Sequence, residues 1–133
     1  MSKMVLSWKR FIFYFITTFL YSGLKGTFRE YSIVKNDIIV SRALLISKVP
    51  NYKFLPKGAI HICYCETVHQ EQGHGYYPML LKYLLANNPN TNFYMIIAED
   101  NIPSIKGVER AGFVRCGEVE KMKDGSFITS KLY

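Results

Sequence analysis

The sequence predicts an α/β protein with a mixed sheet flanked by helices, and three observations carry this prediction. The chain has 133 residues, which is enough for one domain and too few for two separate cores. Hydrophobic residues make up 49% and charged residues 20% of the chain, a globular balance that excludes disordered and collagen-like proteins. Short runs rich in Ile, Val and Leu alternate with segments of helical periodicity. We therefore expect residues 1–133 to form a single domain.

The first expected element is an amphipathic helix within residues 1–26. An apolar run over residues 11–24 follows Lys9 and Arg10, but it is shorter than a membrane-spanning helix and no signal-peptide cleavage site follows it. Helical spacing gathers its polar side chains on one stripe. The opposite face carries Trp8, Phe11, Ile12, Phe15 and Phe19. We expect this face to pack on the domain core, while contact with a membrane surface or a partner, or a signal or spanning segment, are the alternatives.

The next three expected elements are strands. They begin at residue 28, where the core of the domain is expected to start. Residues 28–35 and 38–48 are rich in Ile, Val and Leu and are separated by Asn36-Asp37, which predicts a β-hairpin with a polar turn. A loop with two prolines follows. Residues 59–66 alternate as a buried strand does.

Two helices, one strand and a last hairpin are expected in the remaining chain. Apolar residues at helical spacing predict a helix over residues 76–86. The apolar run 93–98 suits a central strand, and residues 102–111 form a short helix before a terminating glycine. Residues 113–119 and 126–133 are predicted to pair around a turn at Asp124-Gly125.

Cysteine usage favours a reducing compartment and no metal site. The three cysteines, Cys63, Cys65 and Cys116, are odd in number and irregularly spaced, which excludes a disulfide framework. Strand alternation places Cys63 and Cys65 on one face, as for buried apolar thiols. Zinc needs more ligands at better spacing. We expect a cytoplasmic protein without metal, peripheral to a membrane if the first helix binds one.

The positive charge lies in the first half of the chain. The formal net charge is +7, and residues 1–60 hold ten Lys and Arg against Glu30 and Asp37. This imbalance suggests an anionic partner such as a phosphate-bearing cofactor, a membrane surface, an acidic glycan or nucleic acid, although an ordinary basic surface explains it equally well. No nucleic-acid-binding motif is present, so no nucleic-acid partner is expected.

A glycine-containing loop precedes the helix predicted from residue 76. It reads Gln70-Glu71-Gln72-Gly73-His74-Gly75. Glycines let a backbone approach a ligand closely, and the free N–H groups of the following helix end make an anion site suited to a pyrophosphate. The loop is not a Walker motif, because no Lys-Ser/Thr follows, and Pro78 replaces the third glycine of the dinucleotide fingerprint.

A second segment, one strand later, makes the loop more specific. It runs from Asp100 to Phe113, with Asn101, Ser104 and a closing Gly112-Phe113. Together the two segments resemble the GNAT superfamily of N-acetyltransferases. The family loop Gln/Arg-x-x-Gly-x-Gly/Ala is matched by Gln70, Gly73 and Gly75, and its later Asn…Ser/Ala…Gly-Phe segment is matched as well. The resemblance covers residues 28–133.

The resemblance implies an acyl-CoA N-acyltransferase-like sheet whose central strands splay in a V. The pantetheine arm of acetyl-CoA is expected in the gap, paired with backbone groups, while the loop holds the pyrophosphate. A lysine such as Lys106 is expected at the 3′-phosphate. The implied cofactor-binding residues are Cys63, Tyr64, Cys65, Gln70, Glu71, Gln72, Gly73, His74, Gly75, Tyr76, Asn101, Ser104 and Lys106.

Two departures from the family pattern stand out. Val108 occupies the position where relatives often carry a tyrosine that protonates the leaving thiolate; Tyr64, Tyr76, Tyr94 or solvent are the substitutes. The N-terminal part is also shortened, since one helix replaces a strand and two helices before the first hairpin. A domain completed by a second copy in a homodimer is therefore an open alternative.

The candidate general bases lie on the strand at 59–66. Alternation puts Glu66 and His61 on opposite faces, so that one of them would face the thioester. Glu66 adjoins the glycine loop, and His61 would titrate in the useful range. Tyr64 is a candidate acid.

The leading functional hypothesis is an acetyl-CoA-dependent N-acetyltransferase that acts on a primary amine of a small molecule or an amino sugar. The amine would attack the thioester directly in a ternary complex. The alternatives are a CoA-binding module with degenerate catalysis and a peripheral membrane protein attached through its first helix.

Overall fold

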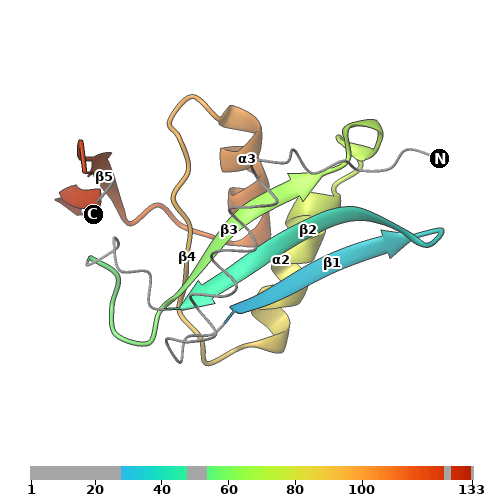
Figure 1. Cartoon of the computed structure of the whole chain (residues 1–133), viewed down its shortest axis with the longest axis horizontal. Helices are drawn as coiled ribbons and strands as arrows, with labels where there is room; N and C mark the ends of the chain where they lie inside the picture. Colours follow the sequence, from blue (N-terminus) through green and yellow to red (C-terminus); the bar gives the residue numbers. More distant parts are fainter. Residues whose placement is uncertain (1–27, 48–53, 125–126, 133) are drawn as a thin grey trace.

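The computed structural model describes residues 28–47, 54–124 and 127–132. The helix expected within residues 1–26 lies outside them. The described residues form a mixed α/β fold (Figure 1), whose elements are β1 (Phe28–Lys35), β2 (Ile38–Ser47), β3 (Ile60–Thr67), the 3-10 turn η1 (His69–Glu71), α2 (Tyr76–Asn87), β4 (Phe93–Tyr94), α3 (Ile102–Ala111), β5 (Gly117–Lys121) and β6 (Phe127–Leu132).

The predicted first hairpin is confirmed. Its turn residues Asn36 and Asp37 have φ angles of 50° and 60°, the left-handed conformation that a two-residue hairpin turn needs and that Asn and Asp tolerate better than most residues. β2 pairs antiparallel with β1 on one side and with β3 on the other. The hairpin therefore supplies half of a four-stranded sheet of order β1-β2-β3-β4.

Both helices pack on one face of this sheet. Their apolar side chains form a single core with the strands, which includes Leu45, Ile62, Leu81, Leu84, Val108 and Ala111. Leu81 and Leu84 are fully buried, because α2 repeats its leucines at the spacing that keeps them on its inner side. α2 contacts β1, β2, β3 and α3, so it connects the hairpin to the second half of the chain.

The prediction of a central strand over residues 93–98 is wrong. Only Phe93 and Tyr94 form β4, which is the last strand of the four-stranded sheet. The apolar run does pack inward, since Phe93, Met95 and Ile97 contact the core. Alternate inward packing satisfies the hydrophobic pattern without a strand ladder, and this is why the sequence alone suggested a longer strand.

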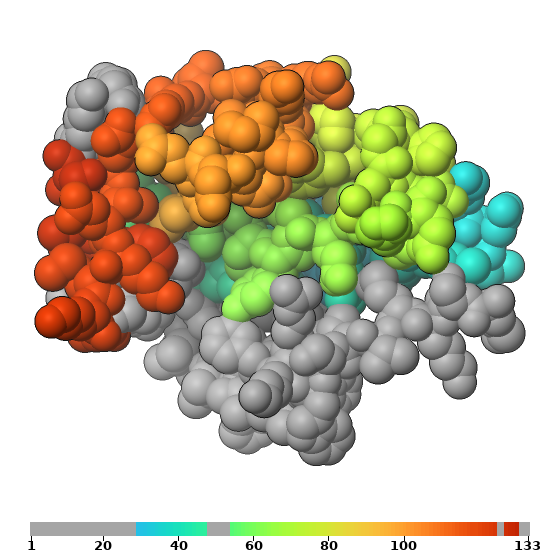
Figure 2. Space-filling view, turned by 90° about the horizontal axis from the view of Figure 1, so that it is seen from above, coloured from blue at the N-terminus to red at the C-terminus, as the bar shows by residue number. Residues whose placement is uncertain are grey.

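The final hairpin forms, but apart from the main sheet. β5 and β6 pair antiparallel as a separate two-stranded sheet. They lie at the end of the molecule opposite the β1–β2 turn (Figures 1 and 2). The first of these strands begins at Gly117 rather than at residue 113; Phe113 packs against the core without joining a strand.

Candidate functional site

A β-bulge in β3 shapes the site. Arg42 pairs with Glu66 and Leu44 with Cys63, so that two β3 residues, Tyr64 and Cys65, lie opposite the single residue between Arg42 and Leu44. Tyr64 has a φ of 49°, a conformation that is uncommon outside glycine, Asn and Asp. This conformation lets β3 accommodate the extra residue. The bulge shifts the alternation of every side chain beyond it.

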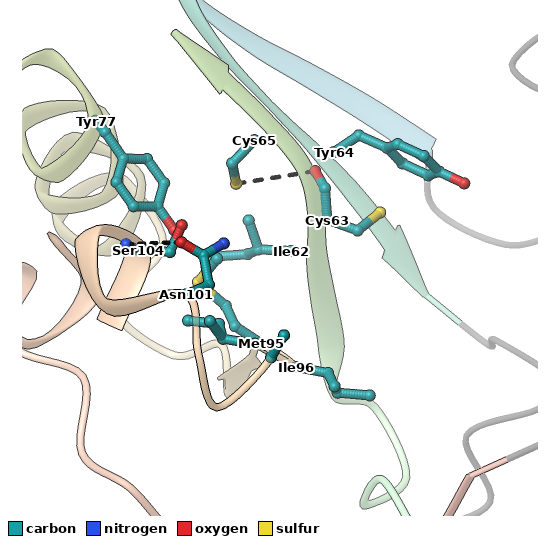
Figure 3. Close-up of a pocket in the computed structure, with 11 residues that line it drawn as sticks. Ile62, Cys63, Tyr64, Cys65, Tyr77, Met95, Ile96, Asn101 and Ser104 are labelled. Atoms are coloured by element: carbon teal, nitrogen blue, oxygen red, sulfur yellow. Dashed lines mark hydrogen bonds between the residues drawn. The ribbon is translucent and has the colours of Figure 1, made fainter. Parts of the chain in front are cut away.

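This shift corrects two predictions about side-chain direction. Cys65 packs against the helix-side core, whereas the side chain of Cys63 leaves β3 on the other side (Figure 3), so the two thiols do not share a face. His61 pairs with Ile46 and Glu66 with Arg42; because these β2 partners are four residues apart, His61 and Glu66 lie on the same face. An unbroken period of two would have given the opposite result in both cases.

Beyond His61, β3 and the chain after β4 separate. Their parallel pairing consists of Ile60 with Phe93 and His61 with Tyr94. A cavity of about 170 Å³ opens past these pairs. Residues of β3 lie beneath α3 and next to the loop that leads into α2 (Figure 2). The cavity is lined by Ile62, Cys63, Tyr64, Cys65, Tyr77, Met95, Ile96, Ile97, Ala98, Asn101 and Ser104 (Figure 3).

The two thiols of the cavity wall stay protonated. Burial raises the pKa of Cys63 to about 12 and that of Cys65 to about 11. The Cys65 thiol donates a hydrogen bond to the Cys63 carbonyl oxygen over 3.9 Å. A nucleophile must be a thiolate, so these cysteines form part of the wall rather than a reactive centre.

Both glycines of the loop have left-handed backbone conformations. Gly73 and Gly75 have φ angles of 81° and 79°, and a Cβ at either would meet nothing within 4 Å. Gly75 is the N-cap of α2, and its carbonyl accepts from the Met79 N–H. The N–H groups of Tyr76 and the next residue precede this first helical bond and are left for an external acceptor. The positive φ angles, rather than packing, thus favour glycine here.

Side chains from elsewhere hold this loop. Gln72 donates from Nε2 to the Thr67 carbonyl at 3.2 Å. Lys35, at the end of β1, donates to both carboxylate oxygens of Glu71 at 3.1 Å, and this bond raises the pKa of Lys35. His74 Nδ1 lies 3.9 Å from the same carboxylate. Lys35 is far from the loop in the sequence and belongs to no motif, so sequence reasoning could not have found this contact. The side chain of Gln70 is exposed in η1.

The second predicted segment reaches the cavity with two of its residues. Asn101 caps α3, its side-chain oxygen accepting from the Ser104 N–H at 3.3 Å, and both residues line the cavity. Gly112 ends the helix with a φ of 99°, as predicted. Lys106 is exposed on α3 and does not line the cavity. Val108 is 8% exposed and belongs to the core.

Neither candidate base lines the cavity. His61 is 5% exposed, and burial lowers its pKa to about 4; the expectation that it titrates near neutrality is therefore wrong, because a charged imidazole at this position would lose its hydration. Glu66 accepts from Arg42 Nη2 at 3.0 Å and stays partly exposed. Tyr64 is among the residues that line the cavity, and it is 52% exposed.

Sequence reasoning missed the pair Tyr77 and Gly107. Tyr77 extends from α2 into the cavity (Figure 3). A Cβ at Gly107 would lie 2.5 Å from Tyr77 Cδ1, so the ring occupies space that only glycine leaves on α3. The unusual glycine inside a predicted helix was the available signal.

Other classes of site find no support in the described part of the chain. Within it, no three His, Cys, Asp or Glu side chains lie close enough together to hold a metal ion. No helix in residues 28–47, 54–124 and 127–132 is long and apolar enough to cross a membrane.

No protein-family model matches the sequence, and a search of curated proteins finds no significant match.

Proposed function

We propose that this protein is an acetyl-CoA-dependent N-acetyltransferase of the GNAT type, which transfers an acetyl group to a primary amine of a small molecule or an amino sugar. One observation carries the proposal. β3 and the chain after β4 separate beyond two paired residues, and the resulting cavity is lined by Tyr77, in the first turn of the helix that the glycine loop opens. Both features are what the sequence resemblance implies for binding an acyl-CoA.

The cavity fits the pantetheine arm in its chemistry. Residues 62–65 and 95–98 line it, and the backbones of these two segments are not paired with each other. An extended arm that carries amide groups can pair with such backbones as an added strand does. Asn101 and Ser104 add polar side chains at the wall.

The loop fits the diphosphate. The first N–H groups of α2 and the helix dipole favour an anion at this end. Gly73 and Gly75 leave open space at that point. Lys106, exposed on α3, is proposed for the 3′-phosphate.

The proposed reaction forms an N–C bond and breaks the C–S bond of the thioester, which supplies the acetyl group. The amine nitrogen loses one proton, and the sulfur gains one. Glu66, which adjoins the bulge and is partly exposed, is the proposed base for the nitrogen, through water where the distance requires it. Tyr64 is the proposed acid for the sulfur. A backbone N–H at the bulge, where the ladder to β2 is interrupted, would polarise the carbonyl.

A CoA-binding module without catalysis is the second candidate, and a specific observation favours it. Val108 is buried in the core, so α3 presents no phenol at the position where relatives carry their acid. This candidate binds CoA as tightly as an enzyme would, but it releases no thiol in the presence of any amine.

Titration calorimetry of the full chain with acetyl-CoA tests the proposal. We expect micromolar binding that Gly75→Trp weakens by more than about tenfold, because the indole would fill the space at the helix end. Gly58→Trp is the matched control, since Gly58 also has a positive φ of 85° and no neighbour within 4 Å but lies outside the loop.

Thiol release over a panel of amines then separates the enzyme from the binding module. Absence of binding by the unmodified chain, or equal weakening by both tryptophan variants, would overturn the assignment of the loop.

A further inference from the structure

Tyr77 occupies the place where α2, α3 and β3 meet. Its side chain points from α2 into the cavity, toward Asn101 and Ser104 (Figure 3). The ring lies against Gly107, where an added Cβ would come within 2.5 Å and 2.7 Å of two ring carbons. A bulkier residue at 107 would therefore displace the ring, and Gly107 acts as a positioning residue for the phenol.

The Tyr77 hydroxyl has only a weak acceptor nearby. Cys65 lies close enough to influence the pKa of Tyr77, and the Cys65 thiol donates its one proton to the Cys63 carbonyl oxygen. The sulfur is therefore left to accept from the phenol. Thiol sulfur is a poor acceptor compared with an amide carbonyl oxygen. If such an oxygen entered the cavity, the phenol would donate its hydrogen bond to that oxygen instead of to the sulfur.

The phenol keeps its proton under ordinary conditions. Burial raises the pKa of Tyr77 above its usual value, and the adjacent Cys65 raises it further. The hydroxyl is thus a donor over the whole range in which the protein would be assayed.

We infer that Tyr77 is a ligand-binding residue whose hydroxyl donates to an amide carbonyl of the arm in the cavity, in exchange for Cys65 Sγ. This inference rests on the proposed function, because it takes pantetheine to be that arm. It assigns a contact to a residue outside both sequence motifs, and it explains why α3 carries a glycine at the point facing α2.

Calorimetry with two ligands tests the inference. CoA carries the arm, whereas ADP carries the diphosphate without it. Tyr77→Phe keeps the ring and removes the donor; we expect it to weaken CoA binding about fivefold to tenfold and to leave ADP binding unchanged. Tyr83→Phe is the matched control, since Tyr83 is on the same helix but is 58% exposed and does not line the cavity.

Gly107→Ala provides a second, independent variant. It should weaken CoA binding by a similar factor, and combining it with Tyr77→Phe should add little, because both changes remove one contact. Thermal unfolding of each variant checks that the fold is kept.

The outcomes are distinguishable. If the unmodified chain binds neither ligand, the proposed function fails and the inference with it. If CoA binds equally to the unmodified chain and to Tyr77→Phe, the inference alone is overturned. If Tyr77→Phe weakens CoA and ADP to the same extent, the hydroxyl does not act on the arm, and the inference is again overturned.

Discussion

The two edges of β3 are built differently. Toward β2 the strand is paired antiparallel from Ile60 to Thr67, with one bulge; we refer to this side as the paired edge. Toward β4 it is paired at Ile60 and His61, and then the cavity begins; this side is the open edge. One strand thus contributes to the fold on one side and forms the wall of a candidate binding site on the other.

The difference shows how a small domain can carry a cleft at low cost in stability. On the β2 side of β3, Ala43 and Leu45 are 0% and 2% exposed. Toward the open edge burial is uneven, since Ile62 is 1% exposed and Tyr64 is 52% exposed, although both residues line the cavity. Apolar burial is most complete where β2 and β3 pair, and the wall of the cavity is less evenly buried.

The largest expected effect is a contrast between matched truncations on the two edges. Leu45→Ala, in the core of the paired edge, should lower the free energy of unfolding by about 4 kcal/mol, because it leaves a cavity that the core cannot fill. Ile96→Ala, at the cavity wall and partly exposed, should cost about 1 kcal/mol. Chemical denaturation measures both. Equal losses would contradict the distinction between the edges.

The next effect concerns His61, the residue at which the two edges diverge. Its pKa is lowered from 6.5 to about 4 by burial, so between these values the unfolded chain binds a proton that the folded chain does not. The contribution of His61 to the free energy of unfolding is therefore fully present above about pH 6.5. It is lost as the pH falls toward 4, which lowers the free energy of unfolding by about 3 kcal/mol. Denaturation curves at several pH values measure it.

A variant that lacks His61 isolates this contribution. His61→Gln should flatten the pH dependence between 6.5 and 4, whatever it costs in stability at neutral pH. His69→Gln, at an exposed position in η1, is the control and should leave the slope unchanged. A slope that survives His61→Gln would assign the pH dependence to other groups.

The smallest effect tests the bulge itself. In an ordinary strand a protein with alanine is more stable than the same protein with glycine. Tyr64, however, has a φ of 49°, where glycine is the less strained residue. Tyr64→Gly should therefore be more stable than Tyr64→Ala by about 1 kcal/mol. At Ile62, in regular strand conformation, the order of the same two substitutions should reverse. The same order at both positions would show that the bulge carries no backbone strain.

Local chemistry accounts for the parts of the fold that sequence reasoning predicted. The hairpin turn at Asn36-Asp37, the start of α2 after Gly75 and the end of α3 at Gly112 all appear where expected. Each depends on residues within one turn of the chain, whose backbone preferences act in the unfolded protein as well. The motif residues Asn101 and Ser104 were predicted from the family resemblance, and both line the cavity.

The candidate site was predicted only in part, because its geometry depends on partners far apart in sequence. The bulge at Tyr64 follows from the register between β2 and β3, and it reversed the predicted direction of Cys65 and of Glu66. Register is set by the packing of a whole face, so a period-two pattern cannot reveal one inserted residue.

By itself, then, the sequence determined the order of the elements, their caps and turns, and the glycine loop, since these are set by the backbone preferences of neighbouring residues. Only the tertiary structure decided that residues 95–98 leave the sheet, that Lys35 binds Glu71, and that Tyr77 lies on Gly107. These contacts join segments that come together once the core has formed, and the free energy that selects them comes from burial and packing rather than from local propensity.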